Sequence, residues 1–337
     1  MKRNALLMAG MLLIFYVDAF LVGAPLQLLL IYVLIGGVVL AGFLEHADHG
    51  ESKAIQHTTP LLSALAALVV MTLSRNWSVP VVVSAALVGS AGGLLEAWGR
   101  GRWPGLGAAL YCGAFAGMTS ELVLGHPAGV ILSGALAGLV LELMHNSWSG
   151  IGGKLGCIAF LGVLGSCGLA TALGLIGFGA KPHHYSSSER ILAMVVVLVA
   201  PQITHHLSYR WNRGAVLGSA LPSLLAGLLL SPPLAGLWLG ASFAGMTAPS
   251  RLVLHPRLEL MAIGAFFGLF SLGFEPTLAG IGGDLGATAA VSVFAVLGLR
   301  RYYPRGLRKR PDSLNASTTA ATPYDTNVIA CPAVPVS

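Results

Sequence analysis

The sequence predicts an all-α polytopic membrane protein with about 10–12 transmembrane segments and an internal, inverted repeat of two five-segment units. Hydrophobic residues make up 55% of the chain and charged residues only 9%, whereas soluble domains carry roughly 25% charged residues. Apolar runs near the ~20 residues that cross a bilayer recur along the sequence. Two motifs also occur twice in the same order, which indicates a duplication.

The duplicated motifs set the register of the repeat. The segment Phe115-Ala-Gly-Met-Thr119 recurs 128 residues later as Phe243-Ala-Gly-Met-Thr247. The segment Gly150-Ile-Gly-Gly-Lys-Leu-Gly156 recurs 130 residues later, with one difference, as Gly280-Ile-Gly-Gly-Asp-Leu-Gly286. Between the two motifs, both copies also carry Leu-Val-Leu and His-Pro in the same order. Matches of this length at one spacing favour an internal duplication over chance.

The apolar segments divide the chain into four parts. Two N-terminal segments, about 6–22 and 25–44, are followed by a loop rich in His and acidic residues, and together they form residues 1–59. The first unit, 60–177, holds segments at about 60–74, 79–96, 104–118, 127–145 and 152–177. The second unit, 178–299, holds segments at about 190–206, 213–231, 233–247, 257–274 and 280–299. Residues 300–337 form a basic tail that we expect to be disordered and cytoplasmic.

The segment count predicts how the two units are oriented. Leu73-Ser74 with Trp77 matches Leu207-Ser208 with Trp211 at an offset of 134, which extends the repeat upstream. Because five segments is an odd number, the second unit enters the membrane from the opposite side. With both termini in the cytoplasm of a cell with an inner (plasma) membrane, most loop Lys and Arg residues lie on the cytoplasmic side, as the positive-inside rule requires. The basic start followed by an apolar run could alternatively be a signal peptide, although Asp18 interrupts it.

The duplicated motifs are the candidate substrate or pore lining. Substrate sites of inverted-repeat transporters lie near the midplane, where helices are interrupted. Glycines there could instead only allow close helix packing. The expected lining residues are Phe115, Gly117, Thr119, Ser120, Gly152 and Gly153 from the first unit, and Phe243, Gly245, Thr247, Gly282 and Gly283 from the second.

Several charged residues are candidates for gating or coupling. Lys154 matches Asp284, and Glu121 matches Arg251, so the sign of the charge is reversed between the copies. These residues could form ion pairs or a gate, or they could lie in headgroup water at helix ends. Glu142 is the acidic residue best embedded in an apolar segment, and it could carry a proton or cation or make a structural hydrogen bond.

No cofactor, catalytic residue or metal site is predicted. The loop from Glu45 to His57 could ligate a divalent metal, but a solvated polar loop is the preferred interpretation. The four cysteines form no Cys-x-x-Cys pair, and no nucleotide-binding or hydrolase motif is present. The basic residues lie in loops and in the tail, so nucleic acid is not an expected partner. The expected partners are the lipid bilayer and a small solute or ion, and the chain could form a homo-oligomer.

The expected function is a transporter or channel for a small solute or ion. Without an ATPase motif, transport would be passive or driven by an ion gradient, along a path at the interface of the two units. A non-transporting membrane scaffold, or a subunit of a larger membrane complex, is the alternative. An intramembrane enzyme acting on lipid would need convergent acid and base groups, and only Glu121, Glu142 and His145 could supply them.

Overall fold

A computed structural model of the chain describes residues 58–100, 102–145, 147–172, 185–252, 254–273 and 280–300, together with Gly10, Leu13 and residues 36–40. Every regular element within these ranges is a helix, so the all-helical prediction is confirmed for this part of the chain. The interpretations of the N-terminal segments, the Glu45–His57 loop and the basic tail fall almost entirely outside the described residues.

The helices follow one order in both halves. The first half comprises α3 (Thr58–Met71), the π-turn η1 (Thr72–Asn76), α4 (Val81–Trp98), α5 (Leu106–Gly117), α6 (Pro127–Leu143) and α7 (Lys154–Ala172). The second half comprises α8 (Ser187–His205), the π-turn η2 (His206–Arg210), α9 (Ala215–Leu229), α10 (Pro232–Gly245), the 3₁₀ turn η3 (Pro249–Arg251), α11 (Pro256–Gly273) and α12 (Asp284–Leu299).

Among the described residues, five helices are long enough and apolar enough to cross a membrane. They cover Thr58–Asn76, Val81–Trp98, Lys154–Thr171, Ser187–Arg210 and Pro256–Gly273. Other apolar helices are shorter, and α5 has only 12 residues. At 1.5 Å per residue it spans roughly 18 Å, less than the ~30 Å of the hydrocarbon core. The expected segments at 104–118 and 233–247 are therefore short helices that end in the interior, because the chain turns after each duplicated Gly-Met-Thr.

The long helices α3 and α8 end in the same way. Each passes into a five-residue π-turn and leaves it through a left-handed residue, Ser78 (φ 54°) in the first half and Asn212 (φ 51°) in the second. The preceding Trp77 and Trp211 are 71% and 60% exposed. Exposed tryptophans at helix ends are typical of the boundary between hydrocarbon and water, so both ends suit a membrane surface.

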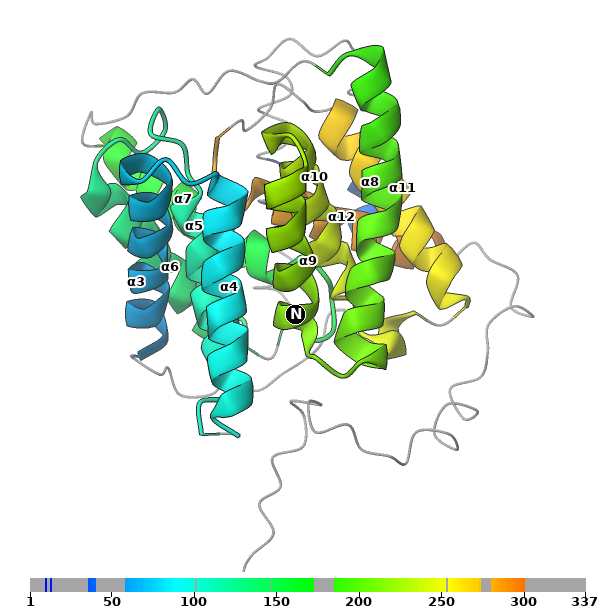
Figure 1. Cartoon of the computed structure of the whole chain (residues 1–337), viewed down its shortest axis with the longest axis horizontal. Coiled ribbons are helices and arrows are strands. Elements are labelled where there is room, and N and C mark those ends of the chain that lie inside the picture. Colours follow the sequence, from blue (N-terminus) through cyan, green and yellow to red (C-terminus); the bar gives the residue numbers. More distant parts are fainter. Residues whose placement is uncertain are drawn as a thin grey trace, which may run out of the picture.

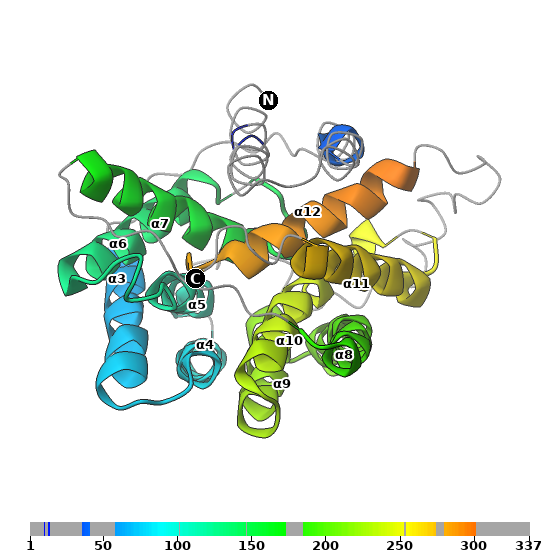
Figure 2. The same cartoon turned by 90° about the horizontal axis from the view of Figure 1, so that it is seen from above.

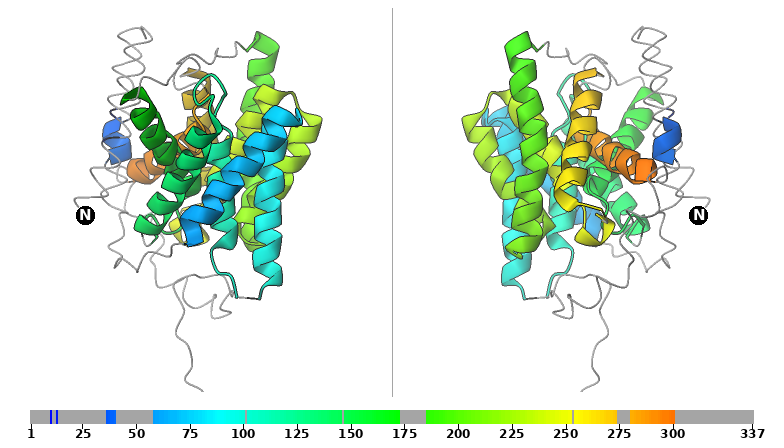
Figure 3. Two further views of the ribbon diagram at one scale, coloured as in Figure 1. Left: turned by 90° about the vertical axis from the view of Figure 1, so that its left-hand side faces the viewer. Right: turned by 90° about the vertical axis from the view of Figure 1, so that its right-hand side faces the viewer.

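The two halves lie side by side, and their first hairpins are connected at opposite ends. The α3–α4 connection lies at the top of the view in Figure 1, whereas the α8–α9 connection lies at the bottom. Seen from above, α3 to α7 form one group and α8 to α12 the other (Figure 2). The side views in Figure 3 show the long, nearly parallel α4 and α8 beside the more tilted helices. Contacts of α4 with α9 and of α7 with α12 join the halves.

Glycines allow the helices that join the halves to approach closely. A Cβ atom on Gly156 in α7 would overlap the backbone of Gly286 in α12, and the reverse is also true. In the other pair, Gly93 of α4 faces Leu217, and Gly227 of α9 faces Val83. Small residues at such crossings are the usual means of close helix packing in lipid, where van der Waals contact drives association.

The α7–α12 crossing predicts a specific stability loss. Gly156→Ala forces the two backbones apart and should lower the free energy of unfolding by about 1–3 kcal/mol, the usual cost of overpacking. Gly168→Ala in the same helix is the matched control, because nothing lies within 4 Å of its Cβ position. The thermal unfolding midpoint in detergent is the measurement. Equal midpoints for the two variants would contradict the described crossing.

Candidate functional site at the contact between the two halves

The duplicated Phe-Ala-Gly-Met-Thr segments form the ends of α5 and α10. Each helix ends in a tighter turn with a hydrogen bond between residues three apart. The Met118 N–H donates to the Phe115 carbonyl at 3.2 Å, and the Met246 N–H donates to the Phe243 carbonyl at 3.1 Å. The threonine that follows is buried in both copies, with Thr119 3% exposed and Thr247 0% exposed. Both threonines therefore lie at interrupted helix ends, away from solvent.

Each threonine binds the glycine turn of the other half. Thr119 Oγ1 donates to the Ala116 carbonyl at 2.7 Å and accepts from the Gly282 N–H at 3.1 Å. Thr247 Oγ1 donates to the Ala244 carbonyl at 2.7 Å and accepts from the Gly152 N–H at 3.2 Å. The two contacts are reciprocal, so neither half completes its interrupted helix without the other.

Backbone hydrogen bonds repeat this exchange one residue further along. The Ser120 N–H donates to the Gly280 carbonyl at 2.8 Å, and the Ala248 N–H donates to the Gly150 carbonyl at 2.9 Å. Gly150 and Gly280 have φ of 72° and 85°, a left-handed conformation that glycine adopts without steric cost. The segments expected at 152–177 and 280–299 begin their helices at Lys154 and Asp284, because the preceding glycines form these turns.

The second and third turn glycines are required by close approach. A Cβ on Gly152 would overlap the Phe243 and Ala244 carbonyls and the Thr247 hydroxyl, and a Cβ on Gly282 would overlap the matching atoms of Phe115, Ala116 and Thr119. The next glycines, Gly153 and Gly283, contact the backbones of α12 and α7, respectively.

Gly117 and Gly245, the last residues of α5 and α10, lie against helices of their own half. Gly117 packs on Ala67 and Val70 of α3, and Gly245 packs on Pro201 and Thr204 of α8. They therefore hold each short helix against the long helix of its own half. Of the expected lining residues, the structure brings the threonines and turn glycines together across the halves and places Gly117 and Gly245 in contacts within each half.

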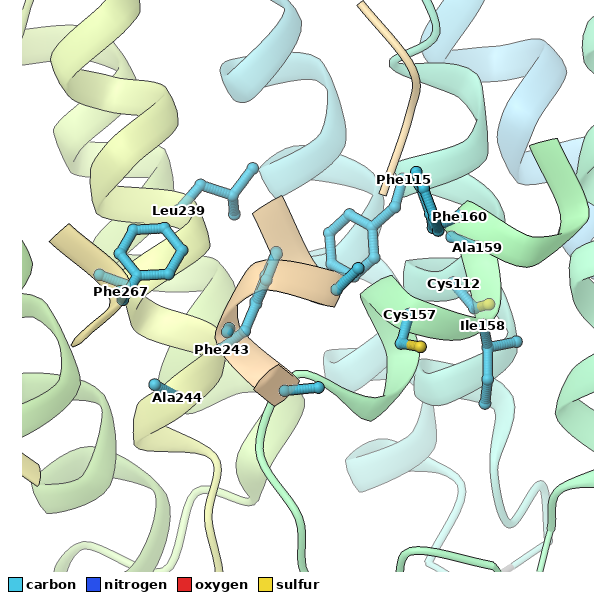
Figure 4. Close-up of a cluster of buried hydrophobic side chains, with 14 of the residues drawn as sticks. Cys112, Phe115, Cys157, Ile158, Ala159, Phe160, Leu239, Phe243, Ala244 and Phe267 are labelled. Carbon is cyan, nitrogen blue, oxygen red and sulfur yellow. The ribbon is translucent and has the colours of Figure 1, made fainter. Parts of the chain in front are cut away.

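A cavity of about 90 Å³ lies beside this reciprocal contact. It is lined by Phe115, Met118, Leu239, Phe243 and the turn Gly280–Gly286. The rings of Phe115 and Phe243 meet with centroids 4.5 Å apart, and Tyr111 lies 4.1 Å from Phe115. Figure 4 shows Phe115 and Phe243 approaching from the two short helices on either side of the α12 ribbon. At roughly 30 Å³ per water, the volume suits about three waters or one small solute.

The sign-reversed residues Lys154 and Asp284 begin the two helices that cross at the centre. Asp284 is the first residue of α12 and lines the cavity, where the positive end of the helix dipole favours a carboxylate. Lys154 is the first residue of α7, and its Nζ donates to the His145 carbonyl at 3.0 Å. The asymmetry between the copies therefore places an acceptor, and not an ammonium group, in the cavity wall.

The other charged candidates lie away from the cavity. Glu121 is exposed, and Arg251 Nε donates to the Ser149 carbonyl of the opposite half at 3.0 Å. Glu142 is half-buried and accepts a hydrogen bond of 2.5 Å from Thr59, which joins α6 to α3. The structure thus assigns Arg251 and Glu142 to structural contacts between segments.

Two residues at the same repeat position were missed by sequence reasoning. Arg75 on η1 donates to the Thr119 carbonyl at 2.9 Å and the Leu124 carbonyl at 3.0 Å. Tyr209 on η2 donates to the Met246 carbonyl at 2.6 Å. Both side chains hold the chain just after a short helix, and π-turns often mark functional sites. The offset of 134 between them, the same as for Trp77 and Trp211, is the signal that could have identified the pair.

No group of three or more His, Cys, Asp or Glu side chains within the described ranges could hold a metal ion. Cys112, Cys157 and Cys167 are buried. Comparisons with protein-family models, curated proteins and solved structures find no match to this chain.

The reciprocal threonine contacts predict two stability losses of similar size. Thr119→Val and Thr247→Val each leave a buried glycine N–H without its acceptor, which should lower the free energy of unfolding by about 1–3 kcal/mol. Thr171→Val is the control, since its hydroxyl bonds only within α7. Unfolding midpoints in detergent measure the effect. A loss in only one of the two threonine variants would contradict the reciprocal arrangement.

Proposed function

We propose that the protein is an integral membrane transporter or channel for a small solute or ion, passive or driven by an ion gradient. The path lies at the interface of two five-segment units related as an inverted repeat. The observation that most supports this proposal is the cavity between the halves. Its wall combines aromatic rings from both short helices with residues 280–286, the glycine turn and the start of α12. Interrupted helices at depth in a membrane are tolerated where they are buried in protein or line a cavity.

The inverted repeat is supported by three observations. The α-helices and π-turns follow the same order in the two halves, and equivalent hydrogen bonds recur at Thr119 and Thr247. The first hairpins of the two halves are connected at opposite ends of the molecule (Figure 1). Binding between such units near the midplane is the common arrangement of secondary transporters.

The proposed setting is an inner (plasma) membrane with both termini in the cytoplasm, as the distribution of loop Lys and Arg favours. Phe115 and Phe243 form the constriction, because their rings meet at the cavity wall. Asp284 is the charged group best placed to influence what enters, since it is the charged residue among those lining the cavity.

A non-transporting scaffold or complex subunit is the second candidate. It is favoured by the burial of Thr119, Thr247 and the turn glycines Gly152, Gly153, Gly282 and Gly283 in contacts between the halves. In such a protein the reciprocal contact would only join the halves, and the cavity would be a gap left by imperfect packing.

Solute flux through purified protein in liposomes tests the proposal. At least one small uncharged solute or ion should enter vesicles containing the protein faster than empty vesicles. Phe115→Leu and Phe243→Leu should raise the flux, because each removes a ring from the constriction while keeping an apolar side chain. Phe270→Leu on α11 is the control, since this buried ring is not part of the cavity wall. Flux equal to that of empty vesicles for every solute would reject transport and favour the scaffold.

A further inference from the structure

A cluster of four hydroxyl groups is buried where the halves meet. Tyr111 comes from α5, Ser219 and Ser223 from α9, and Ser242 from α10, and all four are 0% exposed. Tyr111 Oη lies 3.1 Å from Ser219 Oγ, and Ser219 Oγ lies 2.7 Å from Ser242 Oγ. Ser223 Oγ lies 3.3 Å from Ser242 Oγ, which itself donates to the Leu239 carbonyl at 2.7 Å.

These four contacts use every hydroxyl hydrogen of the cluster. A hydroxyl carries one hydrogen and two lone pairs. Because Ser242 donates to Leu239, Ser219 and Ser223 must both donate to Ser242. Tyr111 must then donate to Ser219. The binding capacity left over therefore consists of lone pairs on the hydroxyl oxygens.

The equivalent positions of the two halves can be compared at this cluster. The positions related to Tyr111 and Ser242 by the offset of 128 are Leu239 and Ala114. Those related to Ser219 and Ser223 by the offset of 134 are Ala85 and Gly89. The reciprocal contacts of Gly93 with Leu217 and of Gly227 with Val83 confirm this register for α4 and α9. The equivalent positions carry no hydroxyl group, and Gly89 leaves room for the Tyr111 ring, so the hydroxyl cluster is a difference between the two halves.

The cluster lies directly behind the wall of the cavity. Tyr111 contacts Phe115 and is edge-on to Phe243, with centroids 6.0 Å apart. Ser242 precedes Phe243 and bonds to the carbonyl of Leu239, which also lines the cavity. The aromatic pair therefore separates two acceptor-bearing regions, the cavity with the Asp284 carboxylate and the hydroxyl cluster.

We propose that this cluster is a binding site for a small, uncharged solute that donates hydrogen bonds, on the far side of the Phe115–Phe243 constriction from the cavity. This inference rests on the proposed transport function and names its substrate class. The cluster supplies acceptors, so an N–H or O–H group of the solute meets Tyr111 and Ser223 when the rings separate. An anion finds no donor there. A cation gives up its hydration with no anionic group among the cluster residues to replace it.

The test uses the full-length protein in liposomes with acetamide and glycerol as uncharged donors, and with potassium, chloride and formate as ions. Stopped-flow light scattering follows the uncharged solutes, and ion-sensitive dyes follow the ions. Tyr111→Phe keeps the ring contacts and removes one hydroxyl, and Ser223→Ala removes another. Ser133→Ala is the matched control, because this equally buried serine bonds only to its own helix, at the Val130 carbonyl.

We expect acetamide or glycerol flux above that of empty vesicles, lowered about fivefold to tenfold in Tyr111→Phe and Ser223→Ala, the usual effect of losing one hydrogen bond. Ser133→Ala should match the unchanged protein. Uncharged flux that Tyr111→Phe and Ser223→Ala leave unchanged would overturn the inference. Flux of ions alone would also overturn it while leaving the transport function standing. No flux of any solute would overturn both, and unfolding midpoints establish that each variant is folded.

Discussion

The structure depends on the exchange of hydrogen bonds between the two threonines and the two glycine turns. A helix that stops inside a membrane leaves backbone groups without partners, and no water is present there to bind them. Thr119 and Thr247 each supply the acceptor that a turn in the opposite half needs. The adjacent backbone pairs from Ser120 to Gly280 and from Ala248 to Gly150 extend the same arrangement. The interrupted helices are thereby satisfied only when both halves are present.

This exchange explains why both motifs are present in each half. A side chain on Gly152 or Gly282 would collide with the short helix of the opposite half, and Gly150 and Gly280 adopt left-handed φ. The motif that ends in threonine and the turn that begins with glycine are therefore two parts of one contact. Differences between the halves surround this symmetric centre, with Asp284 on one side of the aromatic pair and the hydroxyl cluster on the other. The proposed transport path runs between these unequal walls.

Much of the fold could be predicted from the sequence. Apolar run length places α4 and α6 within two residues of their observed bounds, and the doubled motifs locate the interrupted helices. The offset between the motifs could not show that Thr119 binds Gly282 and not Gly152. An offset identifies which residues of the two halves are equivalent, but it does not show which residues are in contact. The sequence leaves open whether Glu142 serves in coupling or makes a structural hydrogen bond, and only the fold shows its contact with Thr59, 83 residues away. The hydroxyl cluster was missed for the same reason, since Tyr111 and Ser219 are 108 residues apart.

Disulfide cross-linking tests the exchange most directly. The experiment uses a chain without its native cysteines and with a protease site inserted within 178–184. Two cysteine pairs join the halves, Ser120→Cys with Gly280→Cys and Ala248→Cys with Gly150→Cys. They are compared with two pairs that each lie inside one half. Those control pairs are Ser120→Cys with Gly150→Cys and Ala248→Cys with Gly280→Cys. The account predicts that, after oxidation and cleavage, only the first two pairs keep the halves covalently joined. Separation of the halves in those variants, with disulfides formed in the control pairs, would contradict it.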